Sequence, residues 1–354
     1  MSATDPHLFE GITQRVIDTP RLLTGILERV GDDPNTPADR TVVLVHGNVS
    51  SSLFWQELMR DLPRDLRVIA VDLRGFGASE HKPVDATRGV RDFSDDVAAA
   101  LDTLDIPAAH LVGWSMGGGV VMQYALDHPV LSLTLQAPVS PYGFGGTRRD
   151  GSRLTDDDAG CGGGGGNPDF IQRLRDGDTS ADAPTSPRNV LRSGYVGPDY
   201  TSEHEDIWVA SMLSTSTDPG NYPGNATETE NWPGFAAGTD GFLNTMVPRY
   251  FDVSGIVDLP EKPPVLWVHG DLDAIVSDAS FYDINHLGAL GIIPGWPGEE
   301  AAPAQQMVSQ TRDVLDAYRA AGGRVTEIEM EGVGHSPHLE RPDDFREALL
   351  ALIR

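Results

Sequence analysis

Short runs of apolar residues recur along the chain, and most of them end in a turn signal that precedes a helical pattern. These runs are continuous rather than alternating, which is typical of parallel strands covered on both faces. They lie at 41–45, 67–71, 110–112, 131–135, 265–268 and 325–330. Residues 8–30 are interpreted as an antiparallel hairpin that precedes the parallel strands.

Helical patterns lie between these strands. In residues 92–105, Phe93, Val97 and Leu101 fall on one stripe, as expected for a helix that packs one face on a sheet. Further helices are predicted at 53–62, 116–128, 307–321 and 342–353. The regular alternation of strands and helices predicts an α/β fold with a mostly parallel, doubly wound sheet.

The alternation fails in residues 141–263, a stretch rich in Gly, Pro, Asp, Asn and Thr. The stretch nevertheless contains many large apolar side chains, which can pack onto another surface. We therefore expect a cap or lid, 141–263, inserted between two segments of an α/β core, 1–140 and 264–354.

Two further stretches are irregular. Gly160 and Cys161 are followed by five glycines at 162–166, and this run predicts a mobile loop within the lid. A second irregular stretch, 284–303, interrupts the unit that follows the strand at 265–268.

Composition narrows the class of protein. The formal net charge of −27 argues against nucleic acid and against an anionic membrane surface as partners. No apolar run approaches the roughly 18 residues that a membrane helix needs, and residues 1–7 lack the features of a secretory signal. A cytoplasmic protein is expected. The single cysteine, Cys161, excludes an internal disulfide and a cysteine-based zinc site, and no cofactor or metal is expected.

A Gly-x-Ser-x-Gly motif lies at 113–117, between a strand pattern and a helix pattern. A strand that turns sharply into a helix strains the backbone of the serine, and glycines avoid clashes there. Such a turn lifts the hydroxyl of Ser115 above the sheet as a candidate nucleophile. It also places the N–H of Met116 at a helix N-terminus, where it can stabilise an oxyanion.

A serine nucleophile needs a base at neutral pH, and the chain order nucleophile, acid, histidine places both partners later in the sequence. His335 follows the last predicted strand and is the expected base. The acid is expected after the strand at 265–268, where both Asp271 and Asp273 lie.

Further motifs accompany these residues: His-Gly-Asn at 46–48, Asp-Leu-Arg-Gly-Phe-Gly-Ala-Ser at 72–79, Gly-Trp-Ser-Met-Gly-Gly at 113–118, His-Gly-Asp-Leu-Asp at 269–273 and Gly-His-Ser-Pro-His-Leu-Glu-Arg-Pro at 334–342. Together they resemble the α/β-hydrolase superfamily over roughly residues 8–140 and 264–354. The resemblance implies that Asp273 is the acid of a catalytic triad, with Asp271 as the alternative. It also implies that the N–H of Asn48 is a second oxyanion donor beside Met116.

The other polar residues of these motifs receive structural interpretations. His46 and His269 each precede a glycine at a strand end and are expected to shape the turn. His338 is interpreted as a surface-loop histidine, with a position at the mouth of the site as the alternative. Asp72 and Arg74 are expected to brace the loop after their strand.

The nucleophile bears on the reaction. Residues 46–55 also resemble the oxyanion segment of haloalkane dehalogenases and epoxide hydrolases, which attack carbon with an aspartate. Serine at position 115 disfavours that chemistry and favours acyl transfer through an acyl-enzyme. The superfamily resemblance implies esters, lactones, thioesters, some amides or carbon–carbon bonds as substrates, so the fold alone does not decide among them.

The lid bears on the substrate. Trp114, Trp208, Phe242 and Met246 are predicted to line a roomy apolar pocket. The alternative is that the aromatic side chains form the core of the lid itself.

The segment 5–15 and the long lid resemble the bacterial zearalenone lactonases, which implies an apolar macrolide lactone as substrate. The alternatives are a general carboxylesterase, a carbon–carbon bond hydrolase, and a ligand receptor that keeps its triad but turns over slowly. A homo-oligomer is a further expectation.

Overall fold

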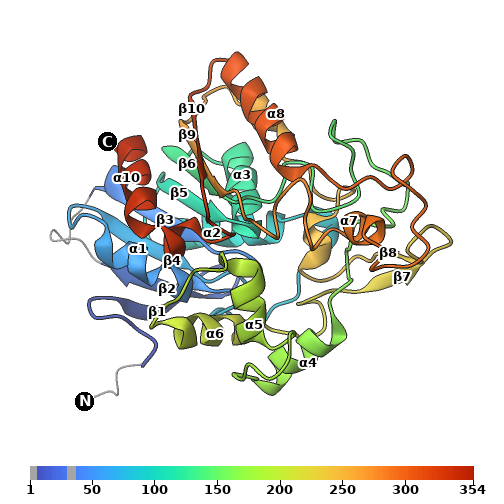
Figure 1. Ribbon diagram of the computed structural model, residues 1–354. Helices are drawn as coiled ribbons and strands as arrows, with labels where there is room; N and C mark the ends of the chain where they lie inside the picture. The colour runs from blue at the N-terminus through green and yellow to red at the C-terminus, as the bar shows by residue number, and fades with distance from the viewer. Residues whose placement is uncertain (1–5, 30–36) are drawn as a thin grey trace.

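The computed structural model describes residues 6–29 and 37–354, and within them an eight-stranded sheet runs through the protein (Figure 1). The strands are β1 (Thr13–Asp18), β2 (Leu23–Arg29), β3 (Thr41–Val45), β4 (Arg67–Val71), β5 (His110–Trp114), β6 (Ser132–Gln136), β9 (Val265–Gly270) and β10 (Val325–Met330). The predicted hairpin and parallel strands are confirmed. Val30, at the end of the predicted hairpin, and Asp5 lie outside the described residues.

The order of the strands decides where their loops meet. In space the order is β1, β2, β4, β3, β5, β6, β9 and β10. β1 and β2 are antiparallel to each other and β2 is antiparallel to β4, whereas all the remaining neighbours are parallel. After β3 the chain forms β4 on one side and then returns to form β5 on the other, so the order reverses between β3 and β5. Ligands of doubly wound sheets bind at the carboxyl ends of the strands beside such a reversal.

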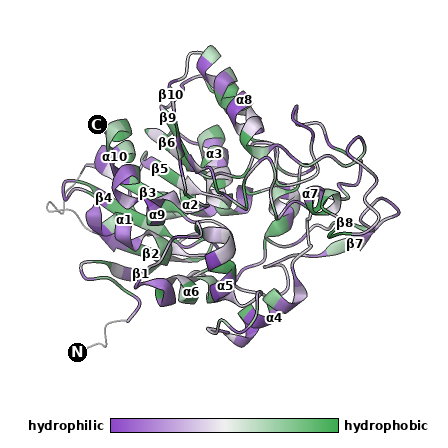
Figure 2. Cartoon of the chain, in the orientation of Figure 1, coloured by the Kyte–Doolittle hydropathy of each residue, from purple (hydrophilic) through white to green (hydrophobic). Residues whose placement is uncertain are grey.

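Helices cover both faces of the sheet, because its parallel strands bury side chains on both sides. α1 packs against α10 on one face, and α2 packs against α3 on the other. Figure 2 shows that α8 and α10 carry both hydrophilic and hydrophobic residues, as expected for helices with one face on a core. These helices are α1 (Gln56–Asp61), α2 (Arg91–Thr103), α3 (Met116–Asp127), α8 (Met307–Ala320) and α10 (Pro342–Ile353).

Each predicted helix is present with ends shifted by a few residues, except that the helix predicted at 53–62 begins as a 3₁₀ turn. The hydroxyl of Ser51 caps that turn by accepting from the N–H of Leu53. The short helical segments of the core are η1 (Ala38–Arg40), η2 (Ser52–Trp55), η3 (Ala86–Arg88) and α9 (Pro337–Glu340).

The chain between β6 and β9 contributes no strand to the main sheet, and the predicted lid lies within this insertion, which forms the lower right of Figure 1. Its elements are α4 (Pro168–Asp176), α5 (Pro187–Val190), η4 (Leu191–Tyr195), α6 (Glu205–Leu213), β7 (Ala226–Glu228), β8 (Phe235–Ala237), η5 (Leu243–Met246) and η6 (Ser254–Asp258). β7 and β8 form a small antiparallel pair of their own.

The second irregular stretch, 284–303, packs against the insertion. It contains α7 (Ile284–Ala289), where a Cβ on Gly288 would lie 2.8 Å from the ring of Trp232. The indole N–H of Trp232, from the insertion, donates to the carbonyl oxygen of Pro294 at 2.9 Å. Two stretches that interrupt the α/β pattern at different places in the sequence therefore form one layer.

The glycine run at 160–166 is packed against the rest of the insertion, so the prediction of a mobile loop is wrong. Cys161 is buried in a small apolar cluster with Ala237 and Val247. A Cβ atom on Gly163 would lie 2.6 Å from Cβ of Ala237 and 2.7 Å from Cγ2 of Val247. Because Gly163 has no side chain, this loop can pack closely on the rest of the insertion. The glycine run is therefore a packed loop and not a flexible linker.

Asp72 and Arg74 brace the loop after β4, as expected. The two carboxylate oxygens of Asp72 accept from the backbone N–H of Ser52 at 2.7 Å and of Ala78 at 2.9 Å. Arg74 makes a bidentate contact with Asp96 on α2, with distances of 2.6 and 2.7 Å. Such planar double contacts hold orientation as well as charge.

His46 shapes the turn after β3, as expected, and is fully buried. Its Nε2 accepts from the backbone N–H of Leu73 at 3.0 Å, so the proton lies on Nδ1, which donates to the carbonyl oxygen of Gly47 at 2.7 Å. Burial lowers the pKa of His46 to about 4. The ring is therefore neutral near pH 7.

His338 corrects a second expectation, since it is buried rather than on a surface loop or at the mouth of the site. Its Nδ1 accepts from Nε2 of Gln136 at 2.7 Å, and its Nε2 lies 3.2 Å from the carbonyl oxygen of Phe54. The ring also packs on that of Trp55, with centroids 4.3 Å apart. Burial lowers the pKa of His338 to about 3, so this histidine packs as a neutral member of the core.

Two possible features are absent from the described residues, 6–29 and 37–354. None of their helices combines the length and the apolar character needed to cross a bilayer. Their His, Cys, Asp and Glu side chains also form no group of three or more that could hold a metal ion.

The packing of the glycine run predicts the effect of a single methyl group. Gly163→Ala should lower the free energy of unfolding by about 1–3 kcal/mol, because the added Cβ overpacks its surroundings. Gly255→Ala is the control, since its Cβ would meet only Cδ2 of Leu126 at 3.7 Å, and it should change stability by less than about 0.5 kcal/mol. Urea unfolding followed by tryptophan fluorescence measures both values. Equal stability of the two variants would contradict the packed loop.

The two buried histidines predict loss of stability in mild acid. In the unfolded chain each takes a proton near pH 6.5, whereas its pKa in the fold is about 4 for His46 and about 3 for His338. The unfolded state therefore binds more protons as the pH falls below about 6.5. Each histidine then lowers the free energy of unfolding by up to about 1.4 kcal/mol per pH unit. Between pH 7 and pH 5, the free energy of unfolding of His338→Gln should fall by about 2 kcal/mol less than that of the parent.

Urea unfolding at the two pH values measures this difference. His81→Gln serves as the control, because this histidine lies on the surface. An unchanged pH dependence in His338→Gln would refute the assignment of a neutral buried ring.

Candidate active site

Ser115 lies at the sharp turn between β5 and α3, at the carboxyl edge of the sheet. Its backbone has φ 57° and ψ −121°, a left-handed conformation that is unusual for a residue with a side chain. Its N–H donates to the carbonyl oxygen of Gln136 at 3.0 Å, which anchors the turn to β6. Such local strain persists where the surrounding structure enforces it, and it is found preferentially at functional sites.

The loop after β3 lies directly against this serine. A Cβ atom on Gly47 would lie 2.9 Å from Cβ of Ser115, so only glycine allows this approach without a shift. Met116 is the first residue of α3, and N–H groups in the first turn of a helix have no partner within the helix. The structure thus brings Ser115, Met116 and the Gly47–Asn48 segment together, as the two predicted oxyanion donors require.

Asn48 is half-buried, and its side-chain Oδ1 is buried without a hydrogen-bond partner among the described residues. Its backbone carbonyl oxygen accepts from the hydroxyl of Tyr195 at 2.8 Å. The next residue, Val49, has φ 46°, so this loop also contains a left-handed residue with a side chain. The loop that carries the predicted oxyanion donor is therefore strained and held by the insertion.

His335 and Asp273 form a buried pair. Nδ1 of His335 lies 2.8 Å from Oδ2 of Asp273, and each side chain is only 1% exposed. The other oxygen of Asp273 accepts from the backbone N–H of Ile275 at 2.8 Å and of Val276 at 2.9 Å. Because a carboxylate only accepts, the proton of the neutral ring lies on Nδ1, and Nε2 keeps a lone pair.

Asp271, the alternative acid, occupies a different environment. It is exposed, and its Oδ1 accepts from the backbone N–H of Gly332 at 2.7 Å. It therefore links the end of β9 to the loop after β10, and the structure pairs His335 with Asp273 instead.

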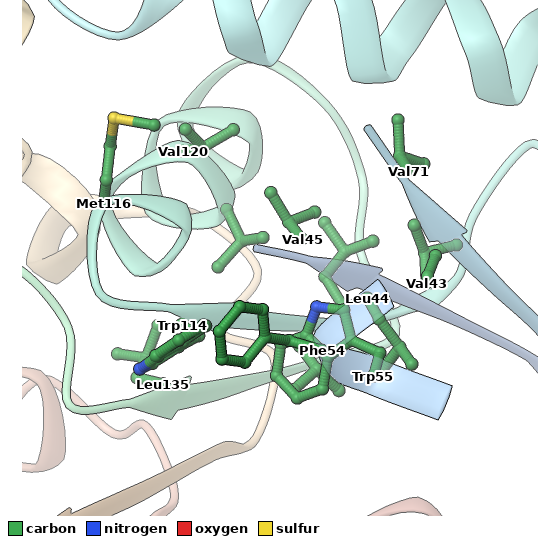
Figure 3. Packing of buried hydrophobic residues seen from close by; sticks show 14 of the residues in the cluster. Val43, Leu44, Val45, Phe54, Trp55, Val71, Trp114, Met116, Val120 and Leu135 are labelled. Atoms are coloured by element: carbon green, nitrogen blue, oxygen red, sulfur yellow. The ribbon is translucent and has the colours of Figure 1, made fainter. Parts of the chain in front are cut away.

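A layer of aromatic side chains lies beneath the histidine loop. The indole N–H of Trp114 donates to the carbonyl oxygen of His335 at 2.8 Å. Figure 3 shows Trp114 beside Phe54 and Trp55, with ring centroids 5.1 and 6.4 Å from that of Trp114. Trp208 continues the layer from the insertion by stacking on Phe54, at 5.3 Å.

The side chains predicted to bind substrate lie in this core rather than on an open pocket. Trp114, Trp208 and Phe242 are each 0% exposed, and Met246 is 6% exposed. Phe242 stacks on Phe76, with centroids 4.5 Å apart. A substrate could not touch the three fully buried rings without a rearrangement. Trp208 and Phe242 pack on Phe54 and Phe76 of the α/β core, so they form neither an open pocket lining nor a core of the lid alone.

Sequence reasoning missed three residues that lie around the site. Tyr195 contacts the Asn48 loop, and burial raises its pKa well above the usual value. Tyr282, from the loop that carries Asp273, is partly exposed, but its hydroxyl lies against Gly194 of the insertion, and burial there raises the pKa of the hydroxyl to about 12. Burial also raises the pKa of Glu340, whose carboxylate bonds to the histidine loop. Tyr195 was visible only as one of many aromatic residues in the insertion, and Glu340 only as part of the 334–342 motif.

Comparison with known proteins gives partial matches in sequence. Residues 40–157 match the family model of the alpha/beta hydrolase fold. The 2-hydroxymuconate semialdehyde hydrolase of Pseudomonas sp. (strain CF600) is 38% identical over 91 residues, which are 25% of this chain and 32% of that protein. The putative carbamate hydrolase RutD of Variovorax paradoxus (strain S110) is 43% identical over 103 residues, 28% of this chain and 38% of that protein. The chain spans about a third of the length of the curated relatives it matches.

Solved structures match over nearly the whole chain. The esterase EaEST from Exiguobacterium antarcticum has a TM-score of 0.58 at 16% identity, covering 96% of this chain and 99% of that one. A putative aryl esterase from Burkholderia cenocepacia has a TM-score of 0.57 at 16% identity, covering 97% and 98%. At this level of identity the likeness concerns the fold alone. Together with the strand order and the family match, it establishes that the chain has the α/β-hydrolase fold.

Proposed function

We propose that the protein is a serine hydrolase that cleaves a carboxylic ester or lactone through an acyl-enzyme. The observation that carries the proposal is the arrangement of two parts at one edge of the sheet. Ser115 stands on a strained turn against Gly47, and His335 is hydrogen-bonded to a buried Asp273. A nucleophile on such a turn, a base and an orienting acid are the parts that acyl transfer requires.

The roles follow from the chemistry of these groups. Oγ of Ser115 attacks the carbonyl carbon while Nε2 of His335 takes the hydroxyl proton. The carbonyl oxygen becomes an oxyanion, which the N–H groups of Asn48 and Met116 stabilise. When the C–O bond to the leaving group breaks, His335 returns the proton to the departing alcohol. Water then attacks the acyl-enzyme with its proton going to His335, and the acid leaves as Ser115 regains its hydrogen.

The substrate we propose is apolar. Most of the exposed large hydrophobic side chains in the described residues lie on the loop that carries Asp273 and just after α7: Leu272, Phe281, Tyr282, Leu290 and Ile292. Large apolar side chains are usually buried, and groups of exposed ones often mark binding surfaces. Within this class, the resemblance noted above favours a macrolide lactone of the zearalenone type, in which the ring ester opens without loss of a separate alcohol.

A second candidate is hydrolysis of a carbon–carbon bond. It is favoured by the similarity to two proteins named as hydrolases of 2-hydroxymuconate semialdehyde and of 2-hydroxy-6-oxo-2,4-heptadienoate. The same serine, histidine and aspartate would serve that reaction. Consumption of 2-hydroxymuconate semialdehyde with no cleavage of simple esters would favour this candidate over the ester hydrolase.

The triad predicts a sharp contrast between two neighbouring aspartates. Ser115→Ala should reduce hydrolysis of p-nitrophenyl butyrate to background, and Asp273→Asn should lower kcat on the order of 10⁴-fold, because the histidine loses its orienting carboxylate. Asp271→Asn is the matched control, since an asparagine oxygen can still accept from Gly332 and activity should stay near that of the parent. Stopped absorbance assays at one pH measure all three. Equal losses for the two aspartate variants would contradict the assignment of Asp273.

The lactone proposal predicts one product. Zearalenone incubated with the protein should give a single species heavier by one water, and Ser115→Ala should give none. Liquid chromatography with mass detection measures the conversion. If p-nitrophenyl butyrate is cleaved and zearalenone is not, the ester hydrolase stands and the lactone substrate is refuted.

A further inference from the structure

One short segment of the insertion touches three of the loops that form the proposed catalytic site, those after β3, β9 and β10. It comprises residues 194–197, and we call it the clasp. It lies at the end of η4, a π-helical stretch, and such stretches are often found at functional sites. The three contacts involve different parts of the chain. The inference rests on the proposed function for its catalytic meaning.

The first contact is with the loop that carries the proposed oxyanion donor. The hydroxyl of Tyr195 donates to the carbonyl oxygen of Asn48 at 2.8 Å and lies 3.3 Å from that of Val49. The latter residue has φ 46°, so the loop is held in a conformation that its side chain disfavours. A buried hydrogen bond at this point opposes relaxation of the loop, and with it rotation of the N–H of Asn48.

The second contact is with the histidine loop. The carboxylate of Glu340 accepts from the N–H of Gly197 at 2.7 Å and from the N–H of Gly334 at 3.0 Å. It also accepts from the N–H of Ser336 at 3.3 Å. One carboxylate therefore ties the clasp to the residues on both sides of His335. The two backbones are so close that a Cβ on Gly334 would lie 2.6 Å from the nitrogen of Gly197.

The third contact is with the loop of the proposed acid. A Cβ on Gly194 would clash with the hydroxyl of Tyr282, so this tyrosine lies directly on the clasp. Tyr195 also lies edge-on to the ring of His335, with centroids 6.1 Å apart. The clasp thus fills the space between loops that follow β3, β9 and β10.

We propose that Tyr195 and Glu340 are positioning residues, which hold the oxyanion loop and the histidine loop in their catalytic geometry through the clasp. Neither side chain is required to touch the substrate. Catalysis is sensitive to changes of about 0.5 Å in the distances between the nucleophile, the base and the oxyanion donors. The insertion on this side therefore acts as a part of the catalytic framework rather than as a cover that swings away.

Three single variants test the proposal. Tyr195→Phe removes only the hydroxyl, and Glu340→Gln removes the charge that holds three N–H groups. Tyr318→Phe is the matched control, because it also loses a buried hydrogen bond from a tyrosine to a carbonyl oxygen, that of Pro263 at 2.7 Å, but lies at the opposite end of β9.

With p-nitrophenyl butyrate, Tyr195→Phe and Glu340→Gln should each lower kcat roughly ten-fold or more with KM changed less than about two-fold. The inhibition constant of an alkyl boronic acid, which forms a tetrahedral adduct with the serine, should rise in parallel. Tyr318→Phe should keep kcat and the inhibition constant within about two-fold of the parent values. This should hold even if its melting temperature falls as much as that of the other two variants. A similar loss of kcat in all three variants would mean a general structural effect and would overturn the proposal.

Amide hydrogen exchange separates this proposal from the proposed function. Tyr195→Phe should speed exchange in residues 46–52, and Glu340→Gln should speed it in residues 332–336, relative to Tyr318→Phe. Unchanged exchange in both segments overturns the clasp, whatever the activity of the protein. A parent protein that cleaves no ester overturns the proposed function, while the exchange data still decide whether the clasp holds the two loops.

Discussion

The proposed site depends on the parallel register of the central strands, because that register brings the ends of distant segments to one level. β3 and β5 pair Val45 with Gly113, so the loop with Asn48 and the turn with Ser115 begin side by side. β9 and β10 pair Gly270 with Met330, which starts the acid and histidine loops at the same edge. The strand order reverses between β3 and β5, and ligands of doubly wound sheets bind beside such a reversal.

The histidine loop has a second support, from the core beneath it. The indole N–H of Trp114 bonds to the carbonyl oxygen of His335, and the same ring packs on Phe54 and His338. His338 contributes because burial keeps it neutral, so that it packs like an aromatic ring while its two nitrogens satisfy Gln136 and Phe54. Van der Waals packing thus holds the position of the histidine loop relative to the core, and the hydrogen bond to Asp273 holds the orientation of the imidazole ring of His335.

The sequence predicted the sheet, most of the helices and the residues at the ends of the strands, because continuous apolar runs and the turn around Ser115 are local signals. It could not predict contacts that depend on where the insertion folds back. Tyr195 looked like any other aromatic residue of the lid, and Trp208 and Phe242 looked like pocket residues although both are fully buried. The prediction for His338 was wrong for the same reason. A polar residue in a loop is expected to be exposed unless its partners on other elements are known.

The clasp belongs to the insertion, whereas most of the exposed apolar side chains lie on the loop after β9 and just after α7. Glu340 and Tyr195 bind the clasp to the histidine and oxyanion loops, and a segment held by partly buried hydrogen bonds to different elements resists local opening. Outside the insertion, the stretch after α7 exposes apolar residues such as Leu290 and Ile292. Exposed apolar surface gains free energy when an apolar molecule covers it. Binding of an apolar molecule there would be favourable, and it would leave the hydrogen bonds of the clasp intact, because these involve other residues.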